Sequence, residues 1–351
     1  MKFLLLPFAW LYGAVVFIRN VCYDRGLLKS RAFDVPVIVV GNLRVGGTGK
    51  TPMTLFLLSL LNQREKRTAM VSRGYGRKTN GQLQVALDHS PDEVGDEPYM
   101  IKQRFPEVQV IVDERRVRGI LSGIESNEDP EVIVLDDGMQ HRKVLPGLLI
   151  MLTAYHKPYY DDFLLPAGRL REPAFEANRA DMIVVTKCPP KLDIHTRRSI
   201  RERIRPMHHQ KVFFACETWK SLSSLWRADD TVEVSSLSDV DVLLVTGVAD
   251  DQTITEQLEQ HCRKVHRIAF KDHHVYTSAS IDRILNSFEG IPSEQKIILT
   301  TEKDAVKLRK WSENEKFAAL PVYAIQHAMA LFSEDVEAFE QRIDEFIRSY
   351  H

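Results

Sequence analysis

A glycine-rich turn at residues 44–51, RVGGTGKT, carries the chemical groups that hold nucleotide phosphates. Glycine at positions 46, 47 and 49 lets backbone N–H groups turn toward an anion, because no Cβ blocks the approach. Lys50 is placed to reach the terminal phosphates, and the hydroxyl of Thr51 is a typical ligand for Mg²⁺. The positive end of a helix that begins at Lys50 adds to the attraction. The residues predicted to bind ATP are Arg44, Val45, Gly46, Gly47, Thr48, Gly49, Lys50 and Thr51.

The common form of this motif is G-x-x-x-x-G-K-[ST], and here Arg44 occupies the first glycine position. The alternative interpretation is a glycine-rich turn between a strand and a helix that binds nothing. The apolar strand pattern at residues 35–40, the turn and the Lys50–Thr51 pair are all in register, which favours the phosphate-binding interpretation.

Paired aspartates, Asp136 and Asp137, follow the apolar segment 132–135. A strand-end aspartate is the usual second anchor for Mg²⁺ in enzymes that hold a nucleotide in such a loop. Either carboxylate fits this role, and because adjacent side chains diverge we expect the two to act differently. The alternative is a structural turn that uses Asp-Gly chemistry.

Two short loops carry groups suited to an acceptor molecule. The segment 71–78, VSRGYGRK, ends a predicted strand with glycines and with basic and aromatic side chains. It suits an anionic or sugar-like acceptor, although a solvated basic turn explains it equally well. The segment 95–98, GDEP, supplies Asp96 and Glu97. These carboxylates either include a general base or are solvated acids that precede a helix.

Two further loops are open to more than one interpretation. The segment 166–173, PAGRLREP, places Arg171 and Glu172 between prolines, where the charges either bind phosphate or pair within the loop. The segment 270–277, FKDHHVYT, contains the Asp272–His273 pair, which can orient a general base or a metal ligand. A structural histidine pair in a loop is the alternative.

Apolar, β-branched runs recur along the first part of the chain and predict strands. They lie at residues 35–40, 67–74, 108–113, 131–138, 148–154 and 181–187, with helical patterns such as 54–63 and 114–124 between several of them. Strands that alternate with helices indicate a largely parallel sheet, which binds its ligands at the carboxyl ends of the strands. We therefore predict a kinase domain of the P-loop type over residues 31–210.

The chain changes character after residue 210. Residues 211–237 alternate like half-exposed strands around a polar turn, and we interpret them as a two-stranded linker. A second series of strand patterns follows at 241–250, 264–270, 296–304 and 321–326, and an amphipathic helix ends the chain. The predicted fold class is thus α/β: a mostly parallel sheet like that of P-loop NTPases, the linker, and a second, smaller α/β domain at residues 238–351.

Composition limits the class of protein. A chain of 351 residues exceeds one ordinary core, and its 44% hydrophobic and 27% charged residues are typical of globular proteins. A net charge of −1 disfavours a partner such as nucleic acid, whose binders usually carry a basic excess. The cysteines at 22, 188, 216 and 262 lack C-x-x-C spacing, so we expect reduced thiols rather than disulfides or a zinc site.

The N-terminal segment is apolar and uncharged from Phe3 to Ile18. It is shorter than the ~20 residues of a comfortable membrane span, and no convincing signal-peptide cleavage site follows it. Basic residues do follow it, and Trp10 and Tyr12 suit the headgroup level of a bilayer. We interpret residues 1–30 as a membrane-associated N-terminal helix; the alternative is a buried helix of a soluble core.

Taken together, these segments resemble one family, the tetraacyldisaccharide 4′-kinases (lipid A 4′-kinases) of Gram-negative bacteria. The matching motifs span nearly the whole chain and are, in order, VGNLRVGGTGKTP, SRGYGRK, VGDEP, LDDGMQHR, LLPAGRLREP, VVTKC, FKDHHVY and TTEKDAVK. The combination of SRGYGRK, DDGMQHR and GRLREP is far more specific than the glycine-rich loop alone.

The resemblance implies transfer of the γ-phosphoryl group of ATP, with Mg²⁺, to the 4′-hydroxyl of tetraacyldisaccharide 1-phosphate, a lipid A precursor, giving lipid IVA. It also implies two α/β/α domains joined by a two-stranded linker. The expected location is the cytoplasmic face of the inner membrane of a Gram-negative bacterium, where the protein is peripheral or monotopic. We expect the membrane and its lipid substrate as partners, and neither nucleic acid nor an obligate protein partner.

The resemblance also assigns roles to the matching residues. Asp96 would be the base toward the sugar hydroxyl, and His273, from the second domain, would pair with it. Asp136 and Asp137 would serve Mg²⁺ and the transferring phosphoryl group, with Thr51 as the metal ligand of the loop and Lys50 at the phosphates. The residues expected to line the acceptor side are Ser72, Tyr75, Arg77, Arg171 and Glu172.

Two rival classes fit the sequence less well. A membrane-tethered switch ATPase of the MinD and ParA type carries K-G-G-x-G-K-[ST], whereas Val45 stands here in place of the signature lysine. A GTPase needs Asp at the end of N-K-x-D or T-K-x-D, but Thr186 and Lys187 are followed by Cys188 and Pro189. A kinase for a soluble sugar or nucleoside leaves the apolar N-terminus without a role.

Overall fold

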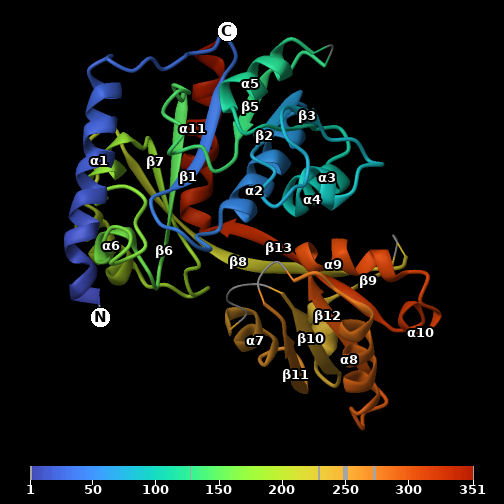
Figure 1. Cartoon of the computed structure of the whole chain (residues 1–351). Coiled ribbons are helices and arrows are strands. Elements are labelled where there is room, and N and C mark those ends of the chain that lie inside the picture. The colour runs from blue at the N-terminus through green and yellow to red at the C-terminus, as the bar shows by residue number, and fades with distance from the viewer. Residues whose placement is uncertain (1, 127, 228–229, 248–251, 272–273, 351) are drawn as a thin grey trace. The chain divides into compact units, whose positions relative to one another are not determined.

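The computed structural model describes residues 2–126, 128–227, 230–247, 252–271 and 274–350. The chain forms two compact units (Figure 1). The first contains Met1–Glu217 and Met329–His351, and the second contains Thr218–Ala328. Each unit is built on parallel strands joined by helices, so the predicted α/β class is confirmed.

The sheet of the first unit is almost entirely parallel. Its strands are β1 (Val37–Asn42), β2 (Thr68–Ser72), β3 (Leu83–Gln84), β4 (Gln109–Val112), β5 (Val132–Leu135), β6 (Leu148–Ala154), β7 (Met182–Thr186) and β8 (Lys211–Ser224). They lie in the order β8-β7-β6-β1-β5-β2-β4-β3, with only β3 antiparallel to its neighbour. Each residue of β1 is buried, which is why the strand reads as an unbroken apolar run. The carboxyl ends of β1, β2 and β5 therefore meet at one edge.

Helices cover both faces of this sheet. They are α2 (Lys50–Gln63), α3 (Pro91–Val94), α4 (Asp96–Arg104), α5 (Arg116–Ile124), α6 (Ile194–Ile204) and α11 (Ser333–Arg348). Ile120 of α5 and Ile204 of α6 join one core with Val39 and Val71 from the strands. The helix α2 packs on β1, β2 and β5, and its Phe56 meets Phe339 of α11 edge to face. The sheet thus holds the start of α2 rigidly beside the end of β1.

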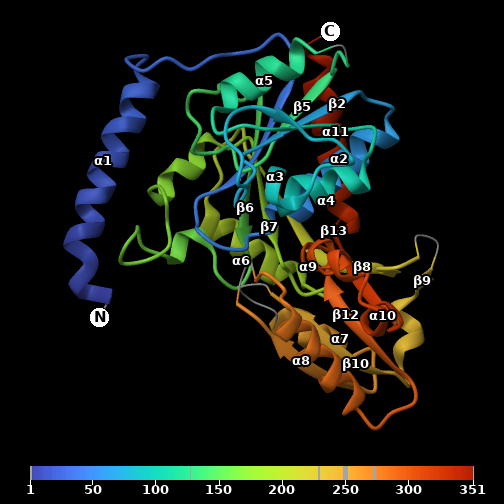
Figure 2. The same cartoon turned by 45° about the vertical axis from the view of Figure 1, so that its right-hand side comes forward.

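The N-terminal helix α1 (Leu6–Asp24) lies at the margin of the first unit, as Figures 1 and 2 show. Its buried residues form one narrow stripe of Ala9, Gly13, Val16 and Asn20. The large apolar side chains that it exposes are Phe8, Trp10, Leu11, Val15, Phe17 and Ile18. By length and composition alone α1 qualifies as a membrane span, with 19 residues and a mean hydropathy of 1.3. Its exposure disfavours the alternative of a buried core helix.

The second unit contains a smaller parallel arrangement. Its strands are β9 (Thr231–Val232), β10 (Asp241–Thr246), β11 (Lys264–Ala269), β12 (Lys296–Thr301) and β13 (Val322–Leu331), and its helices are α7 (Gln252–Leu258), α8 (Ser278–Glu289), α9 (Glu302–Leu308) and α10 (Glu315–Ala318). The order β11-β10-β12-β13 is parallel throughout. Ile281 and Ile284 of α8 pack with Val245 of β10 in its core.

The compact units differ from the domain boundaries expected from the sequence. The segment Met329–His351 belongs to the first unit and not to the C-terminal domain. The reason is the packing of α11, whose Phe339 contacts Phe56 and Phe213 of the first unit. Its polar face is fixed there as well, since Arg64 pairs with Glu340 and Asp344. The amphipathic pattern predicted the helix but not which sheet it covers.

The linker also differs from the expected hairpin at residues 211–237. Among the described residues, β9 pairs antiparallel with the end of β8, where Leu222 and Ser223 face Val232 and Thr231, so the hairpin covers a small part of the expected segment. The chain instead passes between the units in β8 and again in β13, and these two strands are neighbours in the strand order. Local alternation predicts a hairpin, whereas β13, the neighbour of β8 in the strand order, is distant in sequence and leaves no trace in that pattern.

Candidate active site

The glycine-rich loop connects the end of β1 to the start of α2. Gly49 precedes the helix with a φ of 84°, and Gly46 has a φ of 111°. Both values lie where residues with a Cβ are strained. A Cβ on Gly49 would also lie 3.3 Å from Cε of Met329. The N–H groups of Val45 and Thr48 donate to the carbonyls of Arg169 and Gly46, so an anion at the positive end of α2 would meet the N–H groups of the glycines and of Lys50.

Neighbouring polar groups fix the shape of this loop. The hydroxyl of Thr186, at the end of β7, donates to the carbonyl of Thr48 at 2.9 Å. The amide of Asn42 donates to the hydroxyl of Thr48, which is buried. Arg44 is held by Asp162, to which its Nε donates at 2.7 Å. Thr48 and Arg44 thus shape the loop, and Lys50 and Thr51 follow it in the first turn of α2.

Two cations that the sequence did not assign to ATP flank the loop. A Cβ on Gly46 would lie 3.8 Å from Nη1 of Arg169, and a Cβ on Gly47 would lie 3.9 Å from Nζ of Lys187. Lys187 has a φ of 56° and lies 3.7 Å from the carboxylate of Glu217. Together with Lys50, these side chains give the loop a concentration of positive charge that suits a polyanion. In the sequence, the T-K-C segment indicates only that the chain lacks a guanine-binding motif, and the folded chain is needed to bring Lys187 to the loop.

Asp137 is the acidic centre of the site. Arg171 donates to both of its carboxylate oxygens, at 2.8 and 3.2 Å, and Nζ of Lys50 lies 3.8 Å away. Burial alone would raise the pKa of Asp137, but the hydrogen bond from Arg171 and the charge of Lys50 outweigh it and lower the pKa. The carboxylate is therefore ionised, and it lies between the loop lysine and a clamping arginine.

Asp136 has a different environment, as expected for adjacent residues. It is buried, and the hydroxyls of Thr54 and Ser72 donate to it over long distances of 3.3 and 3.4 Å. Burial, followed by the charges of Glu97 and Asp137, raises the pKa of Asp136 to about 7. Long hydrogen bonds offset little of the cost of burying this carboxyl group, so a divalent cation fits as its partner.

The donor set suits Mg²⁺ more than other metals. Carboxylate and hydroxyl oxygens from Asp136, Asp137 and Thr51 are hard ligands of the kind that Mg²⁺ prefers. Within the described part of the chain, no group of three or more His, Cys, Asp or Glu side chains gathers closely enough to hold a metal unaided. A magnesium ion at this edge would therefore share phosphate oxygens and water, as is usual for Mg²⁺ at nucleotides.

The loops predicted for the acceptor come together at the ends of β2 and β5. Gly95 precedes α4 with a φ of 95°, and a Cβ there would lie 3.0 Å from the carbonyl oxygen of Tyr75. The backbone N–H of Lys78 donates to the carbonyl of Asp92 at 2.7 Å. Asp96 and Glu97 thus occupy the first turn of α4, half-buried, beside the SRGYGRK loop.

Of the residues expected on the acceptor side, the structure brings only some to this edge. Ser72 is buried and contacts Asp136, whereas the side chain of Tyr75 is 72% exposed. The guanidinium of Arg77 pairs with Glu114 and donates to the carbonyl of Gly81 at 2.6 Å. Its burial by these structural contacts corrects the expectation that it faces the acceptor.

Glu172 requires the same correction. Its side chain is fully buried and accepts hydrogen bonds from Arg19, Asn20, Gln140 and Arg179. A carboxylate with that many donors has no free face for a sugar. Its neighbour Arg171 is turned toward Asp137 and the carbonyl of Asn42. Local sequence patterns could not predict the pairing of Glu172 with Arg19, because the two residues are separated by 153 positions.

His273 and Asp272 lie outside the described residues, so their predicted role stays a prediction. The adjacent His274 is engaged within the second unit. Its ring stacks on Phe270 with centroids 4.3 Å apart, and its Nε2 lies 2.9 Å from the hydroxyl of Ser280. These contacts indicate a structural role for His274.

A buried arginine near the aspartates was missed in the sequence. Arg116, at the start of α5, is 3% exposed, and its Nη1 donates to the carbonyl of Asp113 at 2.6 Å. Burial lowers the pKa of Arg116 to about 10, although the charges of Asp136 and Asp137 oppose this effect. Its positive charge offsets part of the acidity of the site. Nothing in the pattern ERRVRG distinguishes this arginine from solvated ones.

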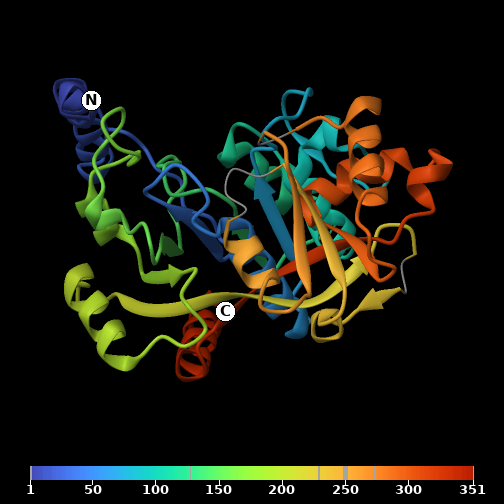
Figure 3. The same ribbon diagram turned by 90° about the horizontal axis from the view of Figure 1, so that it is seen from below.

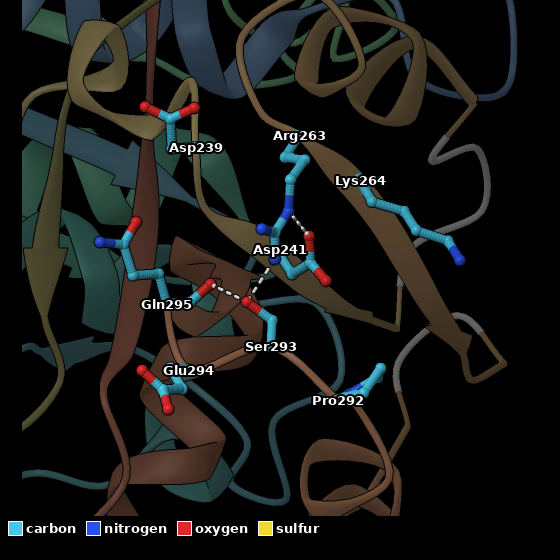
Figure 4. Close-up of a pocket in the computed structure, with 8 residues that line it drawn as sticks. All are labelled: Asp239, Asp241, Arg263, Lys264, Pro292, Ser293, Glu294 and Gln295. Carbon is cyan, nitrogen blue, oxygen red and sulfur yellow. Dashed lines mark hydrogen bonds and ion pairs between the residues drawn. The ribbon is translucent and has the colours of Figure 1, made fainter.

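The second unit contains a pocket of about 590 Å³, shown in Figure 4. It lies at the amino ends of β10, β11 and β12, where a parallel sheet has no helix N-termini or glycine-rich turns. Its Arg263 donates to Asp241 at 2.8 Å and also contacts Ser293. The guanidinium of Arg263 is therefore engaged within the pocket, and Lys264 is the other cation that lines it.

Comparison with known proteins points in the same direction. The family described as "Tetraacyldisaccharide-1-P 4′-kinase" matches residues 1–348. A protein of Bacteroides fragilis (strain ATCC 25285) named tetraacyldisaccharide 4′-kinase is 40% identical over 349 residues, covering 98% of this chain and 93% of its own length. One of Parabacteroides distasonis with the same name is 42% identical over 310 residues, covering 87% of this chain and 84% of its own length.

A solved structure is similar over the same extent. The crystal structure of LpxK from Aquifex aeolicus in complex with ATP matches with a TM-score of 0.75 and 32% identity, covering 99% of each chain.

Proposed function

The chain belongs to the family of tetraacyldisaccharide-1-P 4′-kinases, and on that basis we propose that its first unit transfers the γ-phosphoryl group of ATP to the 4′-hydroxyl of a tetraacyldisaccharide 1-phosphate. The chain is thus an ATP-dependent transferase of lipid A biosynthesis, and lipid IVA is its product. The observation that supports this best is the convergence of Lys50 and Arg171 on Asp137 beside the glycine-rich loop.

Phosphoryl transfer depends mainly on alignment and charge neutralisation. The loop amides and Lys50 would hold the β- and γ-phosphates, and Arg169 and Lys187 would add positive charge at Gly46 and Gly47. Lys50 lies in the first turn of α2, and hydrogen bonds from Thr186 and Asn42 to Thr48 hold the shape of the loop before it.

Mg²⁺ is part of the proposal. Thr51, Asp136 and Asp137 would hold it, and when bound it would neutralise charge on the phosphate oxygens. Asp137 is ionised in this position, because the hydrogen bond from Arg171 and the charge of Lys50 outweigh burial and lower its pKa.

Asp96 is the proposed base. It lies in the first turn of α4, where Glu97 is its neighbour and influences Asp136 electrostatically. A sugar hydroxyl has a pKa far above 7, so Asp96 would accept its proton late in the transfer. The adjacent Tyr75, exposed at the same edge, is suited to contact the sugar.

We propose that α1 seats the protein on the cytoplasmic face of the inner membrane of a Gram-negative bacterium, in a peripheral or monotopic manner. The support is the exposed apolar face of α1, and Trp10 is 72% exposed within it. Phe175, which is also exposed, extends this surface, because its ring meets Phe17 of α1 edge to face at 6.0 Å. Amphipathic surfaces of this kind bury their apolar side in the headgroup and acyl boundary.

A mixed-micelle assay tests the proposal. Full-length protein is incubated with Mg²⁺, γ-labelled ATP and the acylated disaccharide 1-phosphate, with Asp96→Ala alongside. We expect label on the lipid with the wild type and little with the variant. Steady ATP hydrolysis without label on the lipid would contradict the kinase assignment and favour a switch ATPase. Equal labelling of a deacylated disaccharide would contradict the lipid substrate.

A further inference from the structure

The segment Arg169–Glu172 makes contacts in two directions at once. Toward the glycine-rich loop, Val45 N–H donates to the carbonyl of Arg169, and Arg171 N–H donates to the carbonyl of Leu43. Toward the N-terminal helix, the carbonyl of Arg171 accepts a hydrogen bond from the hydroxyl of Tyr12 at 2.8 Å. The same residue therefore joins α1 to the phosphate loop through its backbone and clamps Asp137 with its side chain.

Glu172 makes a second connection of the same kind. From α1, Arg19 and Asn20 donate to its carboxylate at 2.7 and 3.1 Å. From the turn that follows Asp137, Gln140 donates to it at 3.2 Å and also donates to the carbonyl of Asn42 at 2.9 Å. A buried carboxylate is stable only while such donors surround it. Glu172 thus binds α1, the Asp137 turn and the end of β1 into one network.

The helix α1 rests mainly on the loop at residues 162–176, which contains Arg171 and Glu172. Gly13 faces Leu164, since a Cβ on Gly13 would lie 2.6 Å from Cδ1 of that leucine, and Phe17 meets Phe175. Figures 1 and 3 both show this loop lying along α1. Residues 25–36 form the covalent connection to β1 and contain no helix or strand. The middle of α1 is therefore held by the 162–176 loop, and its end is held by Arg142, which pairs with Asp24 and lies over the ring of Tyr23.

We propose that Tyr12 and Glu172 are positioning residues, which use the placement of α1 to hold Arg171 against Asp137. The helix then does more than attach the protein to lipid, because the phosphoryl-transfer site is complete only while α1 lies on the 162–176 loop. This proposal rests on the proposed kinase function. It assigns Glu172 to the support of the site, in place of the acceptor contact that the sequence suggested.

The substitution Tyr12→Phe tests this with little disturbance, since it removes one hydroxyl and keeps the ring. Tyr23→Phe is a matched control on the same helix, where the ring contact to Arg142 is retained. In the micelle assay we expect Tyr12→Phe to lower kcat about three- to tenfold, because small displacements of a catalytic group are costly. KM for the lipid and sedimentation with phospholipid vesicles should match those of Tyr23→Phe. Unchanged kcat, or a loss confined to KM or vesicle binding, would overturn the proposal.

A double-mutant cycle separates positioning from a general structural effect. In an Arg171→Ala background the side chain that Tyr12 helps to position is absent, so Tyr12→Phe should have no further effect on kcat. A loss of the same size in both backgrounds would show that Tyr12 acts by another route.

Hydrogen exchange provides a readout that does not depend on the reaction. In the full-length protein, amides near Asp137, within residues 132–143, should exchange faster in Tyr12→Phe than in Tyr23→Phe. Equal exchange rates in the two variants would refute the positioning role of Tyr12. Absence of label on the lipid with the wild type would refute the proposed function alone, since the exchange comparison stands without it.

Discussion

The two units each place an arginine–aspartate pair at the end of a parallel strand, and of these two pairs the one in the first unit lies beside the phosphate loop. In the first unit, Arg171 and Asp137 lie at the carboxyl end of β5, beside Lys50 and the glycine-rich loop. In the second, Arg263 and Asp241 lie at the amino end of β10, in the pocket of Figure 4. Helix N-termini and strand-to-helix turns gather at the carboxyl edge of a parallel sheet. Strand polarity, and not the charges themselves, separates the two pairs.

Removal of Lys50, the lysine of the glycine-rich loop, should cause the largest loss of activity among the tests of this comparison. We expect Lys50→Ala to lower kcat about 10³-fold, because it removes a cation aimed at the transferring group. The micelle assay measures it, and Lys264→Ala, at the pocket of the second unit, is the matched control. Comparable losses in both variants would break the distinction between the two edges.

Neutralisation of each aspartate compares the pairs directly. We expect Asp137→Asn to lower kcat about 10²-fold, because Arg171 and Lys50 lose the charge that aligns them. Asp241→Asn should leave kcat within about twofold of the wild type. Steady-state kinetics at saturating ATP would decide. A large loss in Asp241→Asn alone would place the reaction at the other edge.

The glycine loop provides a smaller and more selective test. Gly49 and Gly81 both have a φ of 84°, but only Gly49 lies in the loop. Alanine at either position should cost about 1–2 kcal/mol in the free energy of unfolding, measured with urea. ATP binding by calorimetry should weaken only in Gly49→Ala, where the new Cβ also meets Met329. Equal weakening in Gly81→Ala would argue against a specific role of the loop.

The smallest expected effect is a pH-dependent change in Tm, and it concerns the pair of Arg263 and Asp241. The hydrogen bond from Arg263 lowers the pKa of Asp241 below its ordinary value of 3.8. A carboxylate with a depressed pKa stabilises the fold above the ordinary pKa, and this contribution is lost as pH falls through the folded value. Arg263→Met should therefore lower Tm at pH 7, and the difference from wild type should shrink near pH 3. A difference that grows in acid would contradict this, and kcat should not change.

Local pattern predicted much of the fold because its physical causes are local. Buried parallel strands need unbroken apolar runs, and a phosphate loop needs glycines before a lysine, so β1, the loop and α2 were all found in their places. The position of Asp136 and Asp137 at a strand end followed from the same pattern.

Contacts between distant segments were beyond the reach of such patterns. Arg77 and Glu172 were expected to face an acceptor, yet Glu114 and Arg19 hold them in the folded protein. A charged side chain has the same appearance in a sequence whether it meets ligand, solvent or a buried counter-charge. Lys187 and Arg116 were overlooked for the same reason, since only the folded chain shows what lies near them.

The return of the chain to the first unit has a consequence for biosynthesis. The second unit is one uninterrupted stretch, Thr218–Ala328, whereas the first closes its core with Met329–His351. During translation the ribosome therefore completes the second unit before Phe339 can meet Phe56 and Phe213. Domains usually fold in order from the N-terminus as they emerge. Here the N-terminal unit completes its core only when the segment Met329–His351 has been synthesised. Until then the apolar surface that this segment covers is exposed to solvent and to chaperones.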